Sequence, residues 1–137
     1  MACKQALILL TLVTFSSCTK DLSTEELRSH LRSAISLAGE TDVLIGQIGG
    51  HRLSPEFQSG HAGYLRDQAE KEAEDLRKSK AQPEQAQVVQ LCIDQLDLLA
   101  RDLTAVKERK ADERALSAFQ QRVTLILKTL NAAQASL

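Results

Sequence analysis

The sequence is poor in several residue types that mark common functional sites. Its 137 residues include no tryptophan, one methionine, two prolines and three cysteines, and aromatic residues make up only 3% of the chain. Because the one methionine is residue 1, no other methionine is present to serve as an axial haem ligand. The motifs Cys-x-x-Cys-His and Glu-x-x-His are also absent, so the sequence indicates neither covalent haem attachment nor the di-iron signature of helical bundles.

A surplus of charge of one sign is missing as well. The formal net charge is −1, and acidic and basic residues alternate along the chain. Such a balance provides no broad positive field for nucleic acid, so we expect no nucleic-acid partner. A composition of 43% hydrophobic and 26% charged residues is typical of a single globular domain.

The N-terminal segment differs from the rest of the sequence. Lys4 precedes the apolar stretch ALILLTLVTF at residues 6–15, and the small residues of SSC follow it. This order of charged, apolar and small residues is typical of a secretory signal peptide. Ten apolar residues, at a rise of ~1.5 Å each, would cross only about half of a ~30 Å hydrocarbon core, so we do not expect a permanent transmembrane helix.

The residues Phe15-Ser16-Ser17-Cys18 resemble the lipobox of bacterial lipoproteins. The resemblance implies cleavage between Ser17 and Cys18, a diacylglycerol on the Cys18 thiol, and acylation of the new amino group. It therefore implies a membrane partner held through this lipid anchor. Thr19 stands where Asp would be associated with inner-membrane retention, so the resemblance favours the outer membrane, facing the periplasm.

These features divide the chain into a signal peptide at 1–17, a lipidated N-terminus and short tether at 18–22, and a helical domain at 23–137. Cys3 would leave with the signal, which would leave Cys92 as the one free thiol and exclude an intramolecular disulfide. Removal of residues 1–17, which hold Lys4 and no acidic residue, would give a net charge of −2. We expect no cofactor other than the covalent lipid.

Apolar residues after position 23 recur at spacings of three and four, the period of an amphipathic helix. They are Leu27, Leu31, Ala34, Ala38, Thr41, Ile45 and Ile48; Ala62, Leu65, Ala69 and Leu76, interrupted by Glu72; Val89, Cys92, Leu96, Leu99, Leu103 and Val106; and Leu116, Phe119, Val123, Ile126, Leu130, Ala133 and Leu137. Residues that favour helix ends separate these four groups: a Ser23 capping box, Gly49-Gly50, Ser54-Pro55, Pro83 and Asp112.

This pattern predicts an all-α fold, an antiparallel up-down four-helix bundle with helices at about 23–48, 54–79, 83–107 and 112–135. The last two helices could also form one long bent helix, because neither Gly nor Pro lies at 107–110. The apolar register slips by one residue across this charged stretch, which favours a tight turn.

The region GGHRLSPEFQSGH, at residues 49–61, is the best candidate for a binding site. Five of the six glycines lie in or near it, together with the candidate surface residues His51, Arg52, Phe57, His61 and Tyr64. The glycines could allow close backbone approach of a ligand, or they could serve the turn and tight helix crossing. His51 and His61 could converge on a metal, but surface histidines are the simpler interpretation, and we assign no metal ligand.

No nucleophile and base can be combined into a catalytic site from spacing alone, so we expect no enzyme and assign no catalytic residue. Cys92 falls on an apolar helix face and is expected in the core. Our main hypothesis is a lipid-anchored bundle that acts through protein–protein contacts in the cell envelope, as a scaffold, assembly factor or inhibitor, with homo-oligomerisation possible. The alternative is a periplasmic ligand- or metal-binding protein that uses the region from His51 to Tyr64.

Overall fold

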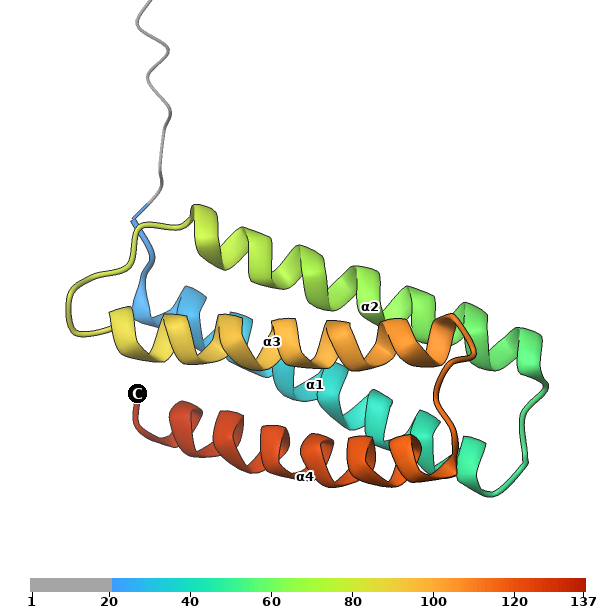
Figure 1. The fold of residues 1–137 in the computed structure, drawn as a ribbon. Helices are drawn as coiled ribbons and strands as arrows, with labels where there is room; N and C mark the ends of the chain where they lie inside the picture. The colour runs from blue at the N-terminus through green and yellow to red at the C-terminus, as the bar shows by residue number, and fades with distance from the viewer. Residues whose placement is uncertain (1–20) are drawn as a thin grey trace, which may run out of the picture.

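The computed structural model describes residues 21–137, which form four α-helices. They are α1 (Thr24–Gly49), α2 (Pro55–Lys78), α3 (Ala86–Lys107) and α4 (Glu113–Ala135). Successive helices run in opposite directions, so the start of α1, the α2–α3 connection and the C-terminus lie at one end of the bundle (Figure 1). The predicted all-α four-helix bundle is therefore confirmed.

Three of the four helices begin where local capping residues predict. Ser23 forms a full capping box with Glu26, with backbone-to-side-chain hydrogen bonds of 2.9 and 3.1 Å. The Ser54 hydroxyl accepts a hydrogen bond from the backbone N–H of Phe57 at 3.3 Å. Asp112 likewise accepts from the N–H of Ala115 at 2.8 Å. These side chains satisfy N–H groups that have no partner within the helix, which fixes where each helix starts.

The start of α3 was predicted wrongly. The helix begins at Ala86, and Pro83 lies instead in a preceding turn. Gln85 closes this turn, because its N–H donates to the carbonyl of Gln82 at 2.9 Å. Gln85 is also buried, and its side-chain amide donates to the Thr24 hydroxyl at 3.1 Å. Gln85, the residue before α3 begins, therefore contacts α1, a tertiary contact that proline placement alone does not reveal.

The two turns at the opposite end each contain a residue with left-handed backbone geometry. α1 ends at Gly49 as expected, but Gly50 has a φ of −82°, and His51 takes the positive φ of 54°. No glycine in residues 21–137 has a positive φ, so the glycines of this turn do not supply its left-handed residue. Arg109 has a φ of 57° in the turn after α3, which separates α3 from α4 and rules out one continuous helix.

The predicted apolar faces form one continuous core. All of the inner positions predicted for α1, α2 and α3 are buried, and in α4 only the two end positions, Leu116 and Leu137, remain partly exposed. Thr41 is buried with its hydroxyl donating to the carbonyl of Leu37 at 2.8 Å. No buried polar side-chain atom within residues 21–137 lacks a hydrogen-bond partner. Across the same residues, the structure contains no helix with the length and apolarity needed to cross a membrane.

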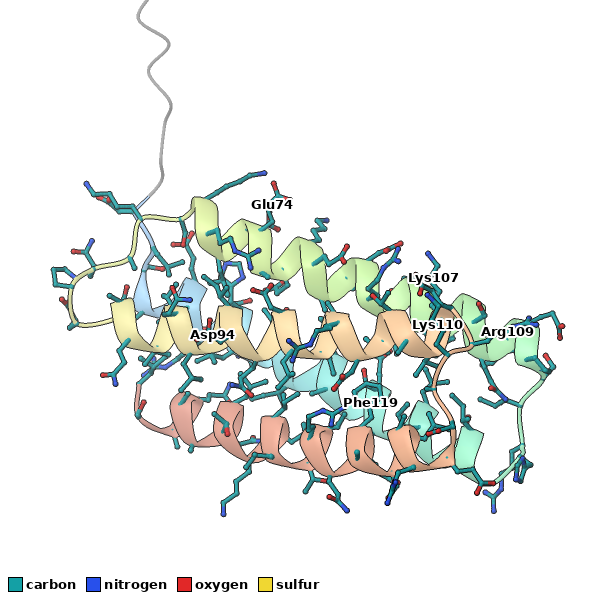
Figure 2. All side chains as sticks on the ribbon, viewed as in Figure 1. Glu74, Asp94, Lys107, Arg109, Lys110 and Phe119 are labelled. Atoms are coloured by element: carbon teal, nitrogen blue, oxygen red, sulfur yellow. The ribbon has the colours of Figure 1, made fainter. Side chains whose placement is uncertain are left out.

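The helices do not pack equally closely. α2 and α3 share the most extensive interface, followed by α1 and α4, whereas α3 and α4 contact each other only sparsely. α2 buries several small residues: Ala62, Gly63, Ala69 and Ala73. At one end of it, the Ser59 hydroxyl donates to the carbonyl of Lys107 at 2.6 Å. Figure 2 shows Lys107 beside α2, and a Cβ atom on Gly63 would lie 3.4 Å from the Lys107 side chain.

Candidate interaction surface

Three ring side chains form a stacked row on the first half of α2. Phe57, His61 and Tyr64 lie at positions i, i+4 and i+7, which places them on one face of the helix. The Phe57 and His61 ring centroids are 5.5 Å apart with an interplanar angle of 21°, and those of His61 and Tyr64 are 6.1 Å apart at 16°. The three rings therefore follow one another along one face of α2, each roughly parallel to the next.

The two ends of this row are exposed to solvent, and His61 between them is partly buried. Phe57 and Tyr64 retain 53% and 55% of their accessible surface, and Val43 on the neighbouring α1 retains 59%. Among residues 21–137, the one other large hydrophobic residue with comparable exposure is Leu125 on α4. Three of these four side chains thus gather on α1 and α2, and we call this area the α1–α2 surface. Exposed apolar side chains scattered singly need no explanation, but a cluster of them is typical of an interaction site.

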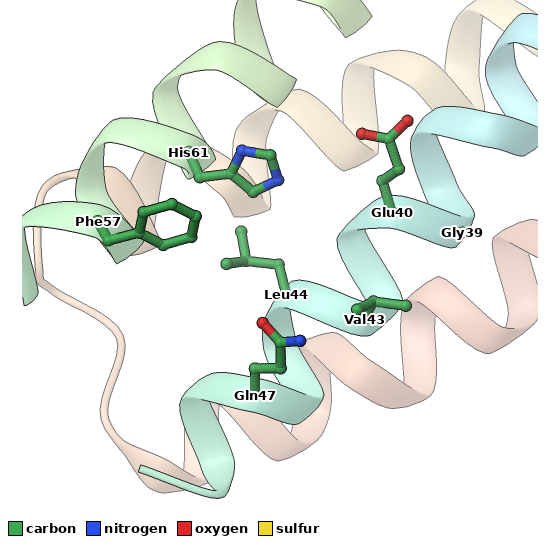
Figure 3. A pocket seen from close by; sticks show the side chains of 7 residues that line it. All are labelled: Gly39, Glu40, Val43, Leu44, Gln47, Phe57 and His61. Atoms are coloured by element: carbon green, nitrogen blue, oxygen red, sulfur yellow. The ribbon is translucent and has the colours of Figure 1, made fainter. Parts of the chain in front are cut away.

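A hollow of about 320 Å³ lies between the row and α1. Phe57 and His61 project from α2, and Val43, Leu44 and Gln47 form the opposite wall on α1 (Figure 3). Leu44 is buried, so the floor of the hollow is continuous with the core. Such a site suits an aliphatic side chain, which could pack against Leu44 beneath the edge of the rings.

A second hollow of about 210 Å³ continues past Tyr64 and has a more polar lining. Glu40 lines both hollows, and Glu72 lines the second. No Lys or Arg side chain lines either one. Within the described part of the chain, Glu40 forms no ion pair with any other residue. The charge at the edge of the α1–α2 surface is therefore negative and available to a partner.

His51 and Arg52 lie apart from the row. His51 lines a different hollow, of about 710 Å³, together with residues of α1 and α4. Arg52 donates its backbone N–H to the carbonyl of Gln47 at 3.1 Å, and its side chain folds back toward Gly50. Of the five candidate residues, the structure thus groups Phe57, His61 and Tyr64. Residues 21–137 contain no group of three or more His, Cys, Asp or Glu side chains arranged to hold a metal ion.

The glycines near this region play smaller roles than their number suggests. A Cβ atom would meet nothing within 4 Å at Gly49 or Gly60, and its nearest contact at Gly46 would be 3.9 Å away. Gly63 is the one buried glycine of the group, against the flexible side chain of Lys107. Tight helix crossing therefore accounts for Gly63 at most. Gly50 leaves room for the Arg52 side chain, 3.4 Å from where its Cβ would lie, and Gly46, Gly49 and Gly60 have no close neighbour of this kind.

The sequence did not predict a polar pair between α1 and α2. His30 Nδ1 lies 2.5 Å from Glu72 Oε1, and both side chains are about four-fifths buried. Glu72 was visible in the sequence as an interruption of the apolar face of α2, which was a signal that a buried carboxylate needed a partner. It did not indicate that the partner would come from α1.

Cys92 lies in the core, as expected, and is a free thiol. Burial, and to a smaller extent the negative charge of Glu72, raises the pKa of Cys92 to about 12. Because the thiolate is the reactive form, Cys92 is a poor nucleophile at neutral pH.

The predicted lipidation and cleavage residues, Ser17 and Cys18, lie outside the described residues, as does the whole predicted signal peptide. The comparisons with known proteins add no family to this description. No protein-family model matches the chain, and neither do the curated proteins or the solved structures with which it was compared.

Proposed function

We propose that this chain is a lipid-anchored protein of the bacterial cell envelope that binds a protein partner through its α1–α2 surface. The single observation that carries the partner proposal is the exposed, stacked row of Phe57, His61 and Tyr64 beside an apolar hollow. Aromatic side chains have few rotatable bonds, so they lose little entropy on binding, and they commonly dominate the energy of an interface. The lipid anchor is supported by the lipobox-like sequence that ends at Cys18, and that sequence favours the periplasmic face of the outer membrane.

The chemistry of the α1–α2 surface supports a particular kind of partner. An aliphatic side chain would fill the hollow above Leu44, and a neighbouring Lys or Arg would meet Glu40. The same cation could also contact the exposed faces of Phe57 and Tyr64, which attract cations through their ring electrons. We therefore expect a partner segment in which aliphatic and basic residues lie side by side.

The position of the row also fits a partner that approaches from the side away from the membrane. α2 begins at the end of the bundle opposite to the chain's N-terminal residues (Figure 1). Phe57 is 21 residues from Lys78 along α2, or about 30 Å at ~1.5 Å per residue. A tether at the N-terminus would therefore leave the row well away from the membrane attachment point.

Photocrosslinking in living cells tests this proposal. A photoreactive phenylalanine analogue replaces Tyr64 in one variant and Gln121, an exposed residue of α4, in a matched control. We expect discrete adducts of higher mass from the Tyr64 variant, weakened by Phe57→Ala and by Glu40→Lys, and none from the control. Equal adducts at both positions, or none at Tyr64, would contradict the partner surface; an adduct of twice the chain mass would identify a second copy as the partner.

Fractionation of the same cells tests the anchor separately. Cys18→Ser should move the protein out of the membrane fraction without changing its helical circular dichroism. Retention of the Cys18→Ser variant in membranes would count against lipid anchoring, whatever the crosslinking result.

A further inference from the structure

An apolar groove of about 470 Å³ lies between α3 and α4. Leu125 lines it and is 61% exposed, so most of this side chain is in contact with solvent. Lys128, one helical turn after Leu125, is the one charged residue of the lining, and it forms no ion pair within residues 21–137. The groove therefore presents an exposed aliphatic side chain beside an available cation.

The α1–α2 surface offers the matching features. Its hollow is floored by the buried Leu44, and the exposed Glu40 lies one turn earlier on α1 (Figure 3). These two residues are four positions apart, or about 6 Å along the helix at ~1.5 Å per residue. On α4, Leu125 and Lys128 are three positions apart, or about 4.5 Å. An α4 helix laid antiparallel to α1 can therefore place its leucine in the hollow while Lys128 reaches Glu40.

We propose that the α1–α2 surface of one copy of this chain binds the α3–α4 groove of a second copy. Leu125 of the second copy fills the hollow on the first, and Lys128 of the second copy pairs with Glu40. The inference rests on the proposed function, because it names a second copy as the partner of the α1–α2 surface. Burial of Leu125 removes apolar surface from water on both copies, and the ion pair fixes the register between them.

The distribution of charge favours this pairing of unlike surfaces over a two-fold symmetric one. Glu40 and Glu72 line the hollows of the α1–α2 surface, and no Lys or Arg does. A symmetric contact between two α1–α2 surfaces would therefore bring carboxylates together. A symmetric contact between two grooves would bring two copies of Lys128 together. Like charges in an interface are unfavourable, whereas the proposed contact joins charges of opposite sign.

The fold lets the two surfaces meet between copies in the same orientation. α2 packs mainly on α3 and α1 on α4, so the α1–α2 and α3–α4 sides of the bundle face in opposite directions (Figure 1). α1 and α4 run antiparallel within one bundle, and the proposed contact also sets α4 antiparallel to α1. Two copies side by side therefore bring α4 against α1 with the start of α1 pointing the same way in both. Attachment of both copies to one membrane requires this common direction.

The contact displaces neighbouring copies along the bundle axis. Leu44 lies 20 residues after Thr24, or about 30 Å at ~1.5 Å per residue. Leu125 lies 10 residues before Ala135, or about 15 Å. The start of α1 and the end of α4 lie at the same end of the bundle (Figure 1), so the displacement is about 15 Å. Each pair leaves one groove and one α1–α2 surface unoccupied, so further copies can extend it into a row.

Disulfide trapping in intact cells tests this contact. Two copies of the full chain with different tags are expressed together, one with Val43→Cys beside the hollow and one with Leu125→Cys. Native Cys92 is buried and is retained in both. On mild oxidation we expect disulfides between copies with different tags and few between copies with the same tag. Gln121→Cys, at an exposed position of α4 outside the groove, replaces Leu125→Cys in the matched control and should give none.

Exchange of the charges tests the register. Glu40→Lys in the Val43→Cys copy should abolish the mixed disulfide, because it places two cations together. Lys128→Glu in the Leu125→Cys copy should abolish it by placing two carboxylates together. The two changes combined should restore it. Both positions are exposed, so the helical circular dichroism of these variants should match that of the parent chain.

The outcomes separate this inference from the proposed function. Disulfides mainly between copies with the same tag, or disulfides that the charge changes do not affect, would overturn the proposed contact. A Tyr64 photocrosslink to a different protein, without the mixed disulfide, would overturn this inference and leave the proposed function standing. Absence of both the mixed disulfide and every Tyr64 adduct would contradict both proposals.

Discussion

The interface between α2 and α3 and the interface between α3 and α4 differ in a way that the connections between the helices do not explain. Both join antiparallel neighbours, and the looser pair has the shorter connection, at residues 108–112 against 79–85. α2 buries four small residues, Ala62, Gly63, Ala69 and Ala73, and Gly63 lies against the Lys107 side chain of α3. Between α3 and α4 there is a groove lined by aliphatic residues of different sizes, and the Asp102–Arg122 ion pair also bridges these two helices. The length of the connection therefore does not set how closely neighbouring helices pack here.

The largest expected difference comes from removing one leucine from each environment. Leu103→Ala empties a fully buried site in the core and should lower the free energy of unfolding by about 2–5 kcal/mol. Leu125→Ala makes the same chemical change at the edge of the groove, where the effect should stay within about 0.5 kcal/mol. Urea denaturation of the two variants measures both values, and similar losses would mean that α3 and α4 close the groove in solution.

Enlarging an alanine should give the next largest effect. Ala73→Leu places three extra carbon atoms at a fully buried site of α2 and should reduce the free energy of unfolding by about 1–3 kcal/mol. Ala132→Leu adds the same atoms beside the groove, so we expect stability to be unchanged or slightly increased. Thermal unfolding midpoints provide the measurement. If Ala132→Leu lowers the midpoint as much as Ala73→Leu does, the groove is packed as closely as the core around Ala73.

The two ion pairs that cross these interfaces should contribute less. Asp102 is 15% exposed in its pair with Arg122, whereas Asp97 and Arg77, which bridge α2 and α3, are both about half exposed. Proximity to Asp102 raises the pKa of Arg122, consistent with a favourable interaction. A double-mutant cycle on Asp102 and Arg122 should give a coupling of up to about 1 kcal/mol that weakens in high salt. The same cycle on Asp97 and Arg77 should give a smaller value, and the reverse order would contradict this ranking.

The smallest expected effect is the absence of thiol reactivity at neutral pH. In a chain with Cys3→Ser and Cys18→Ser, native Cys92 should resist thiol reagents because it is buried and its pKa is raised to about 12. A cysteine placed at Leu125, with Cys92→Ala, should react quickly. Fast labelling of native Cys92 under folding conditions would show that the core opens readily.

The same thiol gives a pH dependence of defined sign. The pKa of Cys92 is raised from about 9 to about 12 on folding, so the folded state keeps its proton where the unfolded state loses it. The contribution of Cys92 to stability is therefore complete below pH 9 and declines as the pH rises from about 9 to about 12. Across this pH range, the free energy of unfolding measured by denaturation should decline less steeply for Cys92→Ala than for the parent chain. Parallel curves would contradict the raised pKa of Cys92.

Much of the fold could be predicted because its signals are local. Ser23, Ser54 and Asp112 bond to N–H groups within the next three residues, so their effect is visible in short stretches of sequence. The apolar period likewise identified the buried face of every helix. At the start of α3, by contrast, Gln85 bonds to Thr24, 61 residues away, and no local pattern encodes that contact.

The candidate surface was only partly predictable for a similar reason. Ser54 and Pro55 define the start of α2, so the spacing of Phe57, His61 and Tyr64 already implied a common face. The helical period does not specify how far each helix is rotated against its neighbour. The contributions of Val43 and Glu40 on α1, and the pairing of His30 with Glu72, therefore became apparent only in the structure.

The contact between Leu22 and the α2–α3 connection has a mechanical consequence. The backbone N–H of Leu22 donates to the carbonyl of Lys80 at 2.9 Å, and the Leu22 side chain is buried. A pulling force applied through the N-terminus would therefore act first on this contact and on the buried leucine, before it reached the first turn of α1. The load would be shared with the end of α2, so the bundle would resist peeling of α1 more strongly than a bundle whose first helix alone met the force.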